Sequence, residues 1–355
     1  MRLLLILSFF CFGTSSMFGQ NPVFPSLEGT ELFNAVVGAF KTTTTLGNSV
    51  SRDVLFGEIY HLPGDSVRCI YTGYTVYVDP SLDPSQAAFA EGLNTEHTYP
   101  KSMGAEGGLA ESDLHHLHPS REDVNADRAS LPFGEVPDAQ ADNWYFMDQE
   151  AFSPPANNID LYSERLINQY FEPREDHKGN VARAVFYFYT IYRNEANAAN
   201  PDFFESQRAD LCEWHALDPV DPDEWERTYL IAAYQDDKPN PFILDCTLAA
   251  RMYCPGLEVE CGTNLSAEET SLQELSGRID LFPNPSQGQL NIQLELLYPV
   301  ELQVRLLDLQ GRVIKELIRT DLQAGNWSDT LDTGDLPNGW YGVQIRLYGK
   351  DGLAQ

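Results

Sequence analysis

The pattern of apolar residues changes near residue 256, and this change divides the chain into two parts that must fold differently. Upstream, the sequence mixes stretches of helical period with short strand-like runs. After a polar, acidic linker at 257–277, short alternating runs are separated by turn sequences such as Asn-Pro-Ser-Gln-Gly. We therefore expect a mainly helical α+β domain at 20–256, followed by a small antiparallel β-sandwich at 278–355.

The upstream part contains four stretches whose apolar spacing favours helices and one that favours strands. The helical stretches are 26–40, 163–171, 177–194 and 222–235, and the strand-like stretch is 67–78. The aromatic run in 177–194 is expected in the core and not as a platform for stacking bases. Asp218, Asp221 and Asp223 are expected as helix caps and surface charges, with a calcium site as the alternative.

The first residues have the features of an export signal. Arg2 precedes an apolar run that is too short to span a bilayer, and small and polar residues follow it, so 1–19 is expected to be removed. No later segment is apolar enough to span a membrane. The remaining cysteines are Cys69, Cys212, Cys246, Cys254 and Cys261. Because five is an odd number, at least one thiol is free or paired elsewhere, and the sequence leaves the pairing open.

The charge balance is strongly acidic. The chain has 53 acidic and 23 basic residues, for a net charge of −30. Acidity keeps an exported protein soluble, and taken alone it argues against a nucleic-acid ligand, because phosphate contacts need Lys and Arg. Any nucleic-acid site must therefore use local basic residues or a bound cation.

Histidines are concentrated in one short region. The chain has seven, and four of them lie between His97 and His118. The adjacent pair Glu96-His97 lies on an extended segment, and "LHHLHPS" is consistent with a second short strand that ends at Pro119. Ser120 is then expected as the N-cap of a helix.

That expected helix places Asn125 and Arg128 on one face. A strand, a strand and a helix would thus bring together a carboxylate, an imidazole and an amide. Hard cations such as Mg²⁺ prefer oxygen ligands and keep several waters, so one carboxylate and one amide oxygen can suffice to hold one.

These segments resemble the bacterial endonuclease I family of secreted nonspecific nucleases, whose active site is a ββα-metal, or His-Me, finger. The resemblance rests on "NTEHTYPKS", "AESDLHHLHPSREDVNADRASLPFGEV", "HKGNVARAVFYFYTIY" and "WHALDPVDPDEWERTYLIAAYQDDKPNPFILD". It implies that His97 is the general base and that Glu96 and Asn125 hold the metal. Glu111 matches an acidic position of the family that is expected to support the catalytic residues without contacting the substrate. Arg128 is expected to clamp a phosphate oxygen.

Some details of the motif stay open. Arg121 is an alternative phosphate clamp. His116 stands where the family often has Asn, so its role is not assigned. His115 is expected to be a hydrogen-bonded scaffold residue, and the role of His118 is open. A zinc cage built from the three clustered histidines is geometrically poor, because His115 on a strand would face away from the other two.

The resemblance implies metal-dependent hydrolysis of phosphodiester bonds. The expected metal is Mg²⁺, with Ca²⁺ or Mn²⁺ as alternatives. The expected substrate is DNA, with RNA as the alternative, and the chain is expected to act as a monomer. His97 would take a proton from the water that attacks phosphorus in line with the leaving 3′ oxygen. The competing hypotheses are a catalytically idle, acidic cell-surface or calcium-binding module on the same fold and hydrolysis of a different phosphodiester.

The tail resembles the type A sorting domain of the type IX secretion system. The motifs that carry this resemblance are "LFPNPSQGQLNI", "VRLLDLQGRVI" and "LPNGWYGVQI", in that order. It implies translocation across the outer membrane by that machinery, to the cell surface or the medium. A carbohydrate-binding or adhesive β-module is the alternative.

Overall fold

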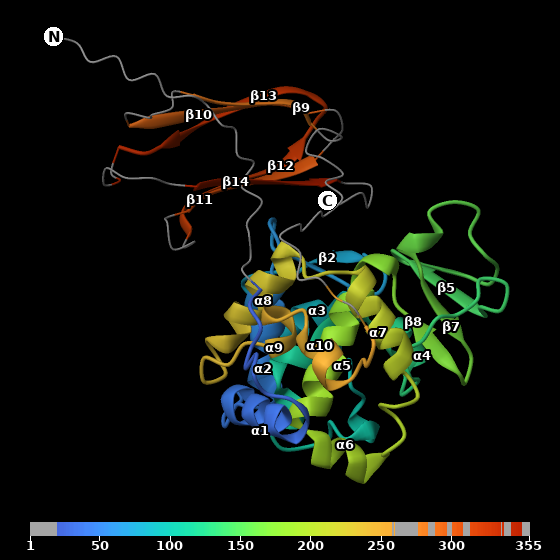
Figure 1. Ribbon diagram of the computed structural model, residues 1–355. Helices are drawn as coiled ribbons and strands as arrows, with labels where there is room; N and C mark the ends of the chain where they lie inside the picture. The colour runs from blue at the N-terminus through green and yellow to red at the C-terminus, as the bar shows by residue number, and fades with distance from the viewer. Residues whose placement is uncertain are drawn as a thin grey trace.

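The computed structural model describes residues 20–257, 259, 276–282, 288–296, 300–307, 313–334, 336 and 342–349. The expected signal peptide, most of the expected linker and Cys261 lie outside the described residues. The upstream part contains both helices and strands, and the regular elements of the described tail are all strands (Figure 1). This confirms the expected α+β class.

The upstream helices are α1 (Gly29–Phe40), α2 (Asn48–Val54), α3 (Pro84–Ala90), α4 (Glu122–Arg128), α5 (Lys178–Ile191), α6 (Arg193–Ala199), α7 (Arg208–Leu217), α8 (Pro222–Ala232), α9 (Pro241–Leu244) and α10 (Leu248–Met252). The upstream strands are β1 (Ser66–Arg68), β2 (Thr75–Tyr77), β3 (Leu93–His97), β4 (Leu117–Arg121), β5 (Asn143–Phe146), β6 (Gln149–Ala151), β7 (Ser163–Leu166) and β8 (Tyr170–Glu172). They form two-stranded sheets β1-β2 and β3-β4 and a four-stranded sheet in the order β6-β5-β7-β8, all antiparallel.

Helix α5 lies at the centre of the upstream domain, and α1, α7 and α9 pack around it (Figure 1). Nearly all of its residues are buried, including Phe186, Tyr187 and Phe188. A helix that is apolar on all sides belongs in the interior. This confirms that the aromatic run is core, and the 3₁₀ turn Leu114–His116, which precedes β4, packs against this helix.

One predicted helix is wrong. The stretch 163–171 forms the hairpin of β7 and β8, in which Glu164 pairs with Glu172. Its turn contains Asn168 at φ 60°, a left-handed conformation that Asn tolerates and that ends a helix. Over so short a stretch, the apolar residues fit both the helical and the strand period. The left-handed turn residue Asn168 therefore decides that a hairpin forms.

The strand-like stretch 67–78 is a hairpin of β1 and β2. Its turn includes Gly73 at φ 73°, whose amide donates to the Cys69 carbonyl at 3.0 Å. A Cβ at Gly73 would approach the Arg174 guanidinium to 2.6 Å, so both the backbone conformation and the available space require glycine. Tyr71, within this turn, is fully buried, and its hydroxyl contacts Glu96.

Two of the three aspartates at the start of α8 are caps. Asp221 is the N-cap of α8 and accepts the Glu224 amide at 2.7 Å, and Asp218 accepts the Gly179 amide at the start of α5 at 2.7 Å. This confirms the cap interpretation for both.

The cysteines are consistent with an oxidising compartment. Cys212 and Cys254 form a disulfide with an S–S distance of 2.03 Å, and Cys246 is disulfide-bonded as well. Among the described residues Cys69 is the free thiol, and it is buried. The prediction that at least one thiol is free or paired elsewhere is confirmed by Cys69.

The tail forms two three-stranded antiparallel sheets, with orders β13-β10-β9 and β12-β11-β14. Their strands are β9 (Ser276–Phe282), β10 (Gln289–Leu296), β11 (Val300–Leu307), β12 (Val313–Leu322), β13 (Gly325–Asp332) and β14 (Gly342–Gly349). Ile292 and Leu294 of one sheet share a buried cluster with Leu302 and Val304 of the other, so the two layers in Figure 1 enclose one core. The sequence analysis missed β13, which is mostly polar.

None of the helices in the described residues combines the length and apolar character that crossing a bilayer would need.

Candidate active site

Strands β3 and β4 and helix α4 form a compact unit in that order. In the antiparallel ladder Glu96 is opposite His118 and His97 is opposite Leu117. Strand β4 runs through Pro119 to Arg121, and α4 starts at the next residue without a side-chain N-cap bond. The predicted cap at Ser120 is therefore wrong, because Ser120 still belongs to the strand and its hydroxyl donates to the Arg121 carbonyl.

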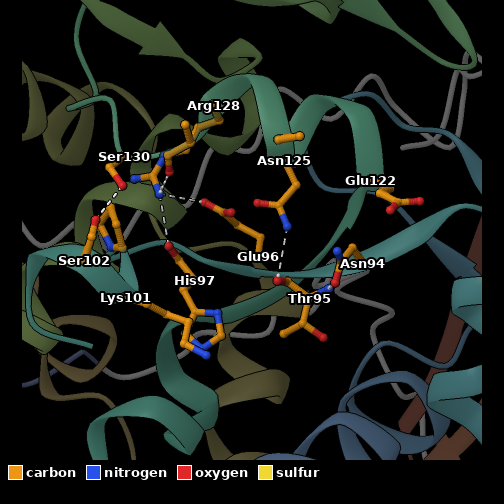
Figure 2. A pocket seen from close by; sticks show the side chains of 13 residues that line it. Asn94, Thr95, Glu96, His97, Lys101, Ser102, Glu122, Asn125, Arg128 and Ser130 are labelled. Atoms are coloured by element: carbon orange, nitrogen blue, oxygen red, sulfur yellow. Dashed lines mark hydrogen bonds and ion pairs between the residues drawn. The ribbon is translucent and has the colours of Figure 1, made fainter. Parts of the chain in front are cut away.

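A pocket of about 450 Å³ opens where β3 ends beside α4. Glu96, His97, Asn125 and Arg128 all line it, although they are up to 32 positions apart in the sequence. Figure 2 shows the Glu96 carboxylate between the Arg128 guanidinium and the Asn125 amide, while the His97 ring leaves the strand in the opposite direction. Adjacent strand residues point to opposite faces, and both can reach one pocket here because the strand ends at His97.

His97 is held by one hydrogen bond from its ring. Nε2 donates to the backbone carbonyl of Glu111 at 3.0 Å, so Nδ1 carries the lone pair of the neutral imidazole. Burial, with a smaller contribution from His116, lowers the pKa of His97 to about 3. At neutral pH the ring is therefore uncharged and can accept a proton.

Glu111 contributes in two ways. Its carbonyl orients His97, and its carboxylate accepts hydrogen bonds from Lys101 Nζ at 2.5 Å and Asn48 Nδ2 at 2.8 Å. The hydrogen bond from Lys101 is the largest cause of the lowered pKa of the Glu111 carboxyl. Glu111 itself does not line the pocket, but Lys101 does, so Glu111 acts on the site through its neighbours.

Glu96 is almost fully buried, at 1% exposure. Tyr71 donates to its Oε1 at 2.8 Å, and Arg128 Nη1 lies 3.1 Å from the same oxygen. Burial raises the pKa of Glu96, and Arg128 and Tyr71 act in the opposite direction. Tyr71 and Arg128 both contact Oε1, so neither of these two donors occupies Oε2.

The amide of Asn125 is oriented in a similar way. Its Nδ2 donates to the Thr95 carbonyl at 3.2 Å, which turns Oδ1 toward the side of the Glu96 carboxylate (Figure 2). One carboxylate oxygen and one amide oxygen thus face the same pocket. In the described part of the chain, no group of three or more His, Cys, Asp or Glu side chains could hold a metal. A pair of oxygen donors fits Mg²⁺, which retains several waters.

The two candidate arginines differ in position. Arg128 is 1% exposed and donates to the carbonyls of His97 and Thr98 at 3.1 and 2.7 Å, in addition to its contact with Glu96. Arg121 does not line the pocket. Its guanidinium binds Asp123 and the carbonyls of Met147 and Gln149.

His116 supports the segment that orients His97. It lies in a 3₁₀ turn at Leu114–His116, and its Nε2 donates to the Ala110 carbonyl at 2.7 Å. Its ring packs edge-on against His97 with a centroid distance of 5.6 Å. His116 therefore fixes the residue next to Glu111, whose carbonyl holds His97.

His115 and His118 are separate from the pocket. His115 Nε2 donates to the Lys238 carbonyl at 2.8 Å, so His115 is a buried scaffold residue as predicted. His118 Nδ1 contacts the Tyr60 hydroxyl at 2.5 Å. The turn at Leu114–His116 replaces the expected strand at these positions, because the Asp113 carboxylate accepts the His115 amide and caps the turn.

His115 provides a test of this burial through pH. Burial lowers its pKa to about 4, so between pH 6.5 and 4 the unfolded chain binds a proton that the folded chain does not. This contribution therefore lowers stability as pH falls through that window. His115→Gln keeps an amide donor and removes the titration. From pH 7 to pH 5 we expect the wild type to lose about 2 kcal/mol more unfolding free energy than the variant. Urea unfolding at both pH values measures this, and equal losses in the two proteins would contradict it.

Sequence analysis did not identify Tyr71 or the two serines at the pocket rim. Ser102 and Ser130 place their hydroxyl oxygens 2.6 Å apart (Figure 2). Ala129, which follows α4 at φ 50° and ψ −117°, turns the chain so that Ser130 returns to the pocket. These contacts join residues 25 or more positions apart, and no local pattern in the sequence indicates them.

Two curated proteins resemble part of the chain. An extracellular ribonuclease of Bacillus subtilis (strain 168) is 32% identical over 164 residues, which is 42% of this chain and 50% of that protein. An extracellular ribonuclease of Bacillus amyloliquefaciens is 31% identical over 164 residues, with the same coverage. The chain thus spans about half the length of the curated relatives that it matches.

The family comparison covers both parts of the chain. Residues 56–246, more than half of the chain and all of the pocket, match the model of the endonuclease I family. Residues 280–351 match the secretion system C-terminal sorting domain, which implies recognition by the secretion machinery. The chain therefore belongs to the endonuclease I family of nucleases and carries a type IX sorting domain behind its nuclease domain.

Proposed function

We propose that this chain is a secreted, metal-dependent, sequence-nonspecific endonuclease that hydrolyses phosphodiester bonds in DNA and RNA. The observation that carries the proposal is the pocket itself. It is lined by His97, whose imidazole has its lone pair on Nδ1, and by Glu96 and Asn125, which supply two oriented oxygen donors. Both curated relatives are extracellular ribonucleases, which supports RNA as a second substrate.

His97 serves as the general base in this proposal. Because Nε2 is occupied by the Glu111 carbonyl, a proton from an attacking water is taken up at Nδ1. The carbonyl then stabilises the resulting imidazolium by accepting its Nε2–H. The lowered pKa of His97 keeps the ring uncharged at neutral pH.

Glu96 and Asn125 would hold a divalent cation, with Mg²⁺ as the first choice. Bound there, the cation would neutralise charge on the scissile phosphate and on the leaving 3′ oxygen. The residues of the chain orient the two donors: Thr95 holds the Asn125 amide, and Tyr71 and Arg128 hold the Glu96 carboxylate. These three residues would thus set the geometry of the two donors.

The acidic charge of the chain sets a condition on this proposal. Residues 21–256 contain 15 Lys and Arg against 38 Asp and Glu, a net of −23. At the pocket, Lys101 supplies a half-exposed ammonium close to His97, although it is paired with Glu111. A bound cation adds positive charge where the phosphate must lie. We therefore propose that nucleic acid binds weakly unless the metal is present.

The ends of the products test the proposed chemistry. We expect the purified chain with Mg²⁺ to cut end-labelled DNA and RNA strands of matched sequence at many internal positions. Cleavage of either substrate should leave 5′-phosphate and 3′-hydroxyl ends, because water attacks phosphorus and the 3′ oxygen is the leaving group. Ligation of the products and mass spectrometry identify these ends. RNA products that end in a 2′,3′-cyclic phosphate would contradict the proposal, since they require attack by the 2′-hydroxyl and not by water.

A further inference from the structure

The Glu96 carboxylate receives two donors on one of its oxygens. Tyr71 Oη donates to Oε1 at 2.8 Å, and Arg128 Nη1 lies 3.1 Å from the same atom. All three side chains are almost fully buried, with exposures of 0–1%. A buried carboxylate that accepts two charge-assisted or hydroxyl hydrogen bonds on one oxygen cannot rotate freely. Its second oxygen therefore keeps a fixed direction.

Both donors are themselves fixed by the same group of aromatic rings. The Tyr71 ring packs on Phe171 at 4.8 Å between centroids, and the Arg128 guanidinium lies 4.4 Å from the centre of the Phe133 ring. Phe133 and Phe171 contact each other at 6.4 Å. The Ser163 hydroxyl also donates to the Tyr71 carbonyl at 2.7 Å.

Arg128 also fixes the end of the strand that carries the site. It donates to the carbonyls of His97 and Thr98, so one guanidinium joins the C-terminal end of α4 to the end of β3. These contacts direct the guanidinium toward oxygens of the protein, with 1% of the residue exposed. Both Nη atoms are thus engaged by the protein, and Nε, which has no hydrogen-bond partner among the described residues, is buried.

We propose that Tyr71 and Arg128 are positioning residues that fix Oε1 of Glu96, so that Oε2 is presented with Oδ1 of Asn125 to the divalent cation. This inference rests on the proposed function, because it concerns the same site. It assigns Arg128 a role through Glu96 in place of the phosphate clamp suggested by the sequence. Partners of metal ligands that fix the orientation of the ligand typically change metal affinity about 10–100-fold when they are removed.

The test is a titration of the purified chain with Mn²⁺, in which the free ion is followed by electron paramagnetic resonance. Tyr71→Phe removes only the hydroxyl and keeps the buried ring. We expect it to weaken Mn²⁺ binding about 10–100-fold. Cleavage at saturating Mn²⁺ should recover toward the wild-type kcat, since the base and both ligands remain.

Tyr145→Phe is the matched control. Tyr145 is also fully buried and stacks on Phe171 at 6.3 Å, but its hydroxyl donates to Asp127 and not to Glu96. We expect its Mn²⁺ affinity to stay within about twofold of the wild type. Thermal unfolding of all three proteins checks that the fold is retained, and recovery of kcat at high Mn²⁺ separates a weakened metal site from a damaged fold.

The outcomes distinguish the inference from the function on which it rests. If Tyr71→Phe binds Mn²⁺ as the wild type does, or is weakened no more than Tyr145→Phe, the positioning role is wrong and the nuclease proposal stands. Loss of cleavage in Tyr71→Phe that no Mn²⁺ concentration restores also overturns it. If the wild type binds no Mn²⁺ and cuts no nucleic acid, both proposals fail.

Discussion

His97→Ala is expected to lower the single-turnover rate of DNA cleavage by about 10²–10⁴-fold, the usual contribution of a positioned general base. The imidazole is the neutral group in the pocket whose unprotonated nitrogen can take a proton from water, because Nε2 already donates to Glu111. Mn²⁺ affinity should change little, since Glu96 and Asn125 keep their own partners. Quenched-flow cleavage of a labelled duplex at saturating metal measures the rate.

His61→Ala is the control for this variant. His61 is a partly exposed residue that contacts Asp65 at 3.3 Å and lies outside the pocket. The His61→Ala variant should cleave DNA at the wild-type rate. If His97→Ala retained more than about a tenth of the wild-type rate with the fold intact, a different group would have to act as the base.

The largest expected loss of stability is at the ion pair between α5 and α8. Arg183 and Glu224 are 0% and 3% exposed, and their charged atoms approach to 2.6 Å, with a second bond of 2.8 Å from Nε. Glu224→Ala leaves the guanidinium buried without its carboxylate, which typically costs about 3–5 kcal/mol. Urea unfolding at pH 7 measures the loss.

An exposed pair provides the comparison. Glu205 and Arg208 approach to 2.8 Å, with side-chain exposures of 56% and 34%. Water screens this pair, so Glu205→Ala should cost less than about 1 kcal/mol. Equal losses in Glu205→Ala and Glu224→Ala would show that burial of the α5–α8 pair does not determine its contribution.

Long periodic segments were predictable from their apolar spacing, whereas one short segment was assigned to the wrong type of element. The helices α1, α5 and α8 follow from apolar spacing sustained over three or more turns. The hairpin of β7 and β8 was mistaken for a helix because strands of three or four residues show too little of either period. A left-handed Asn168 in the turn, visible only in the structure, decides between them.

The site divides in the same way. Glu96, His97 and Asn125 were predicted from a local motif, and the structure places all three in one pocket. Their roles as ligands and base remain proposals. Tyr71 was not found, because its contact with Glu96 spans 25 positions and depends on the β1–β2 hairpin. A local pattern can indicate which groups react, but the partners that orient them come from distant segments of the chain.

The most direct test of the central claim is nicking of supercoiled plasmid by the purified wild-type chain. We predict conversion to open circles with Mg²⁺, none with EDTA, and full recovery when Mg²⁺ is added back in excess. A wild-type chain that leaves plasmid and RNA intact with Mg²⁺, Mn²⁺ and Ca²⁺ at low salt would contradict the account. It would favour instead a catalytically idle, acidic surface module on the endonuclease I fold.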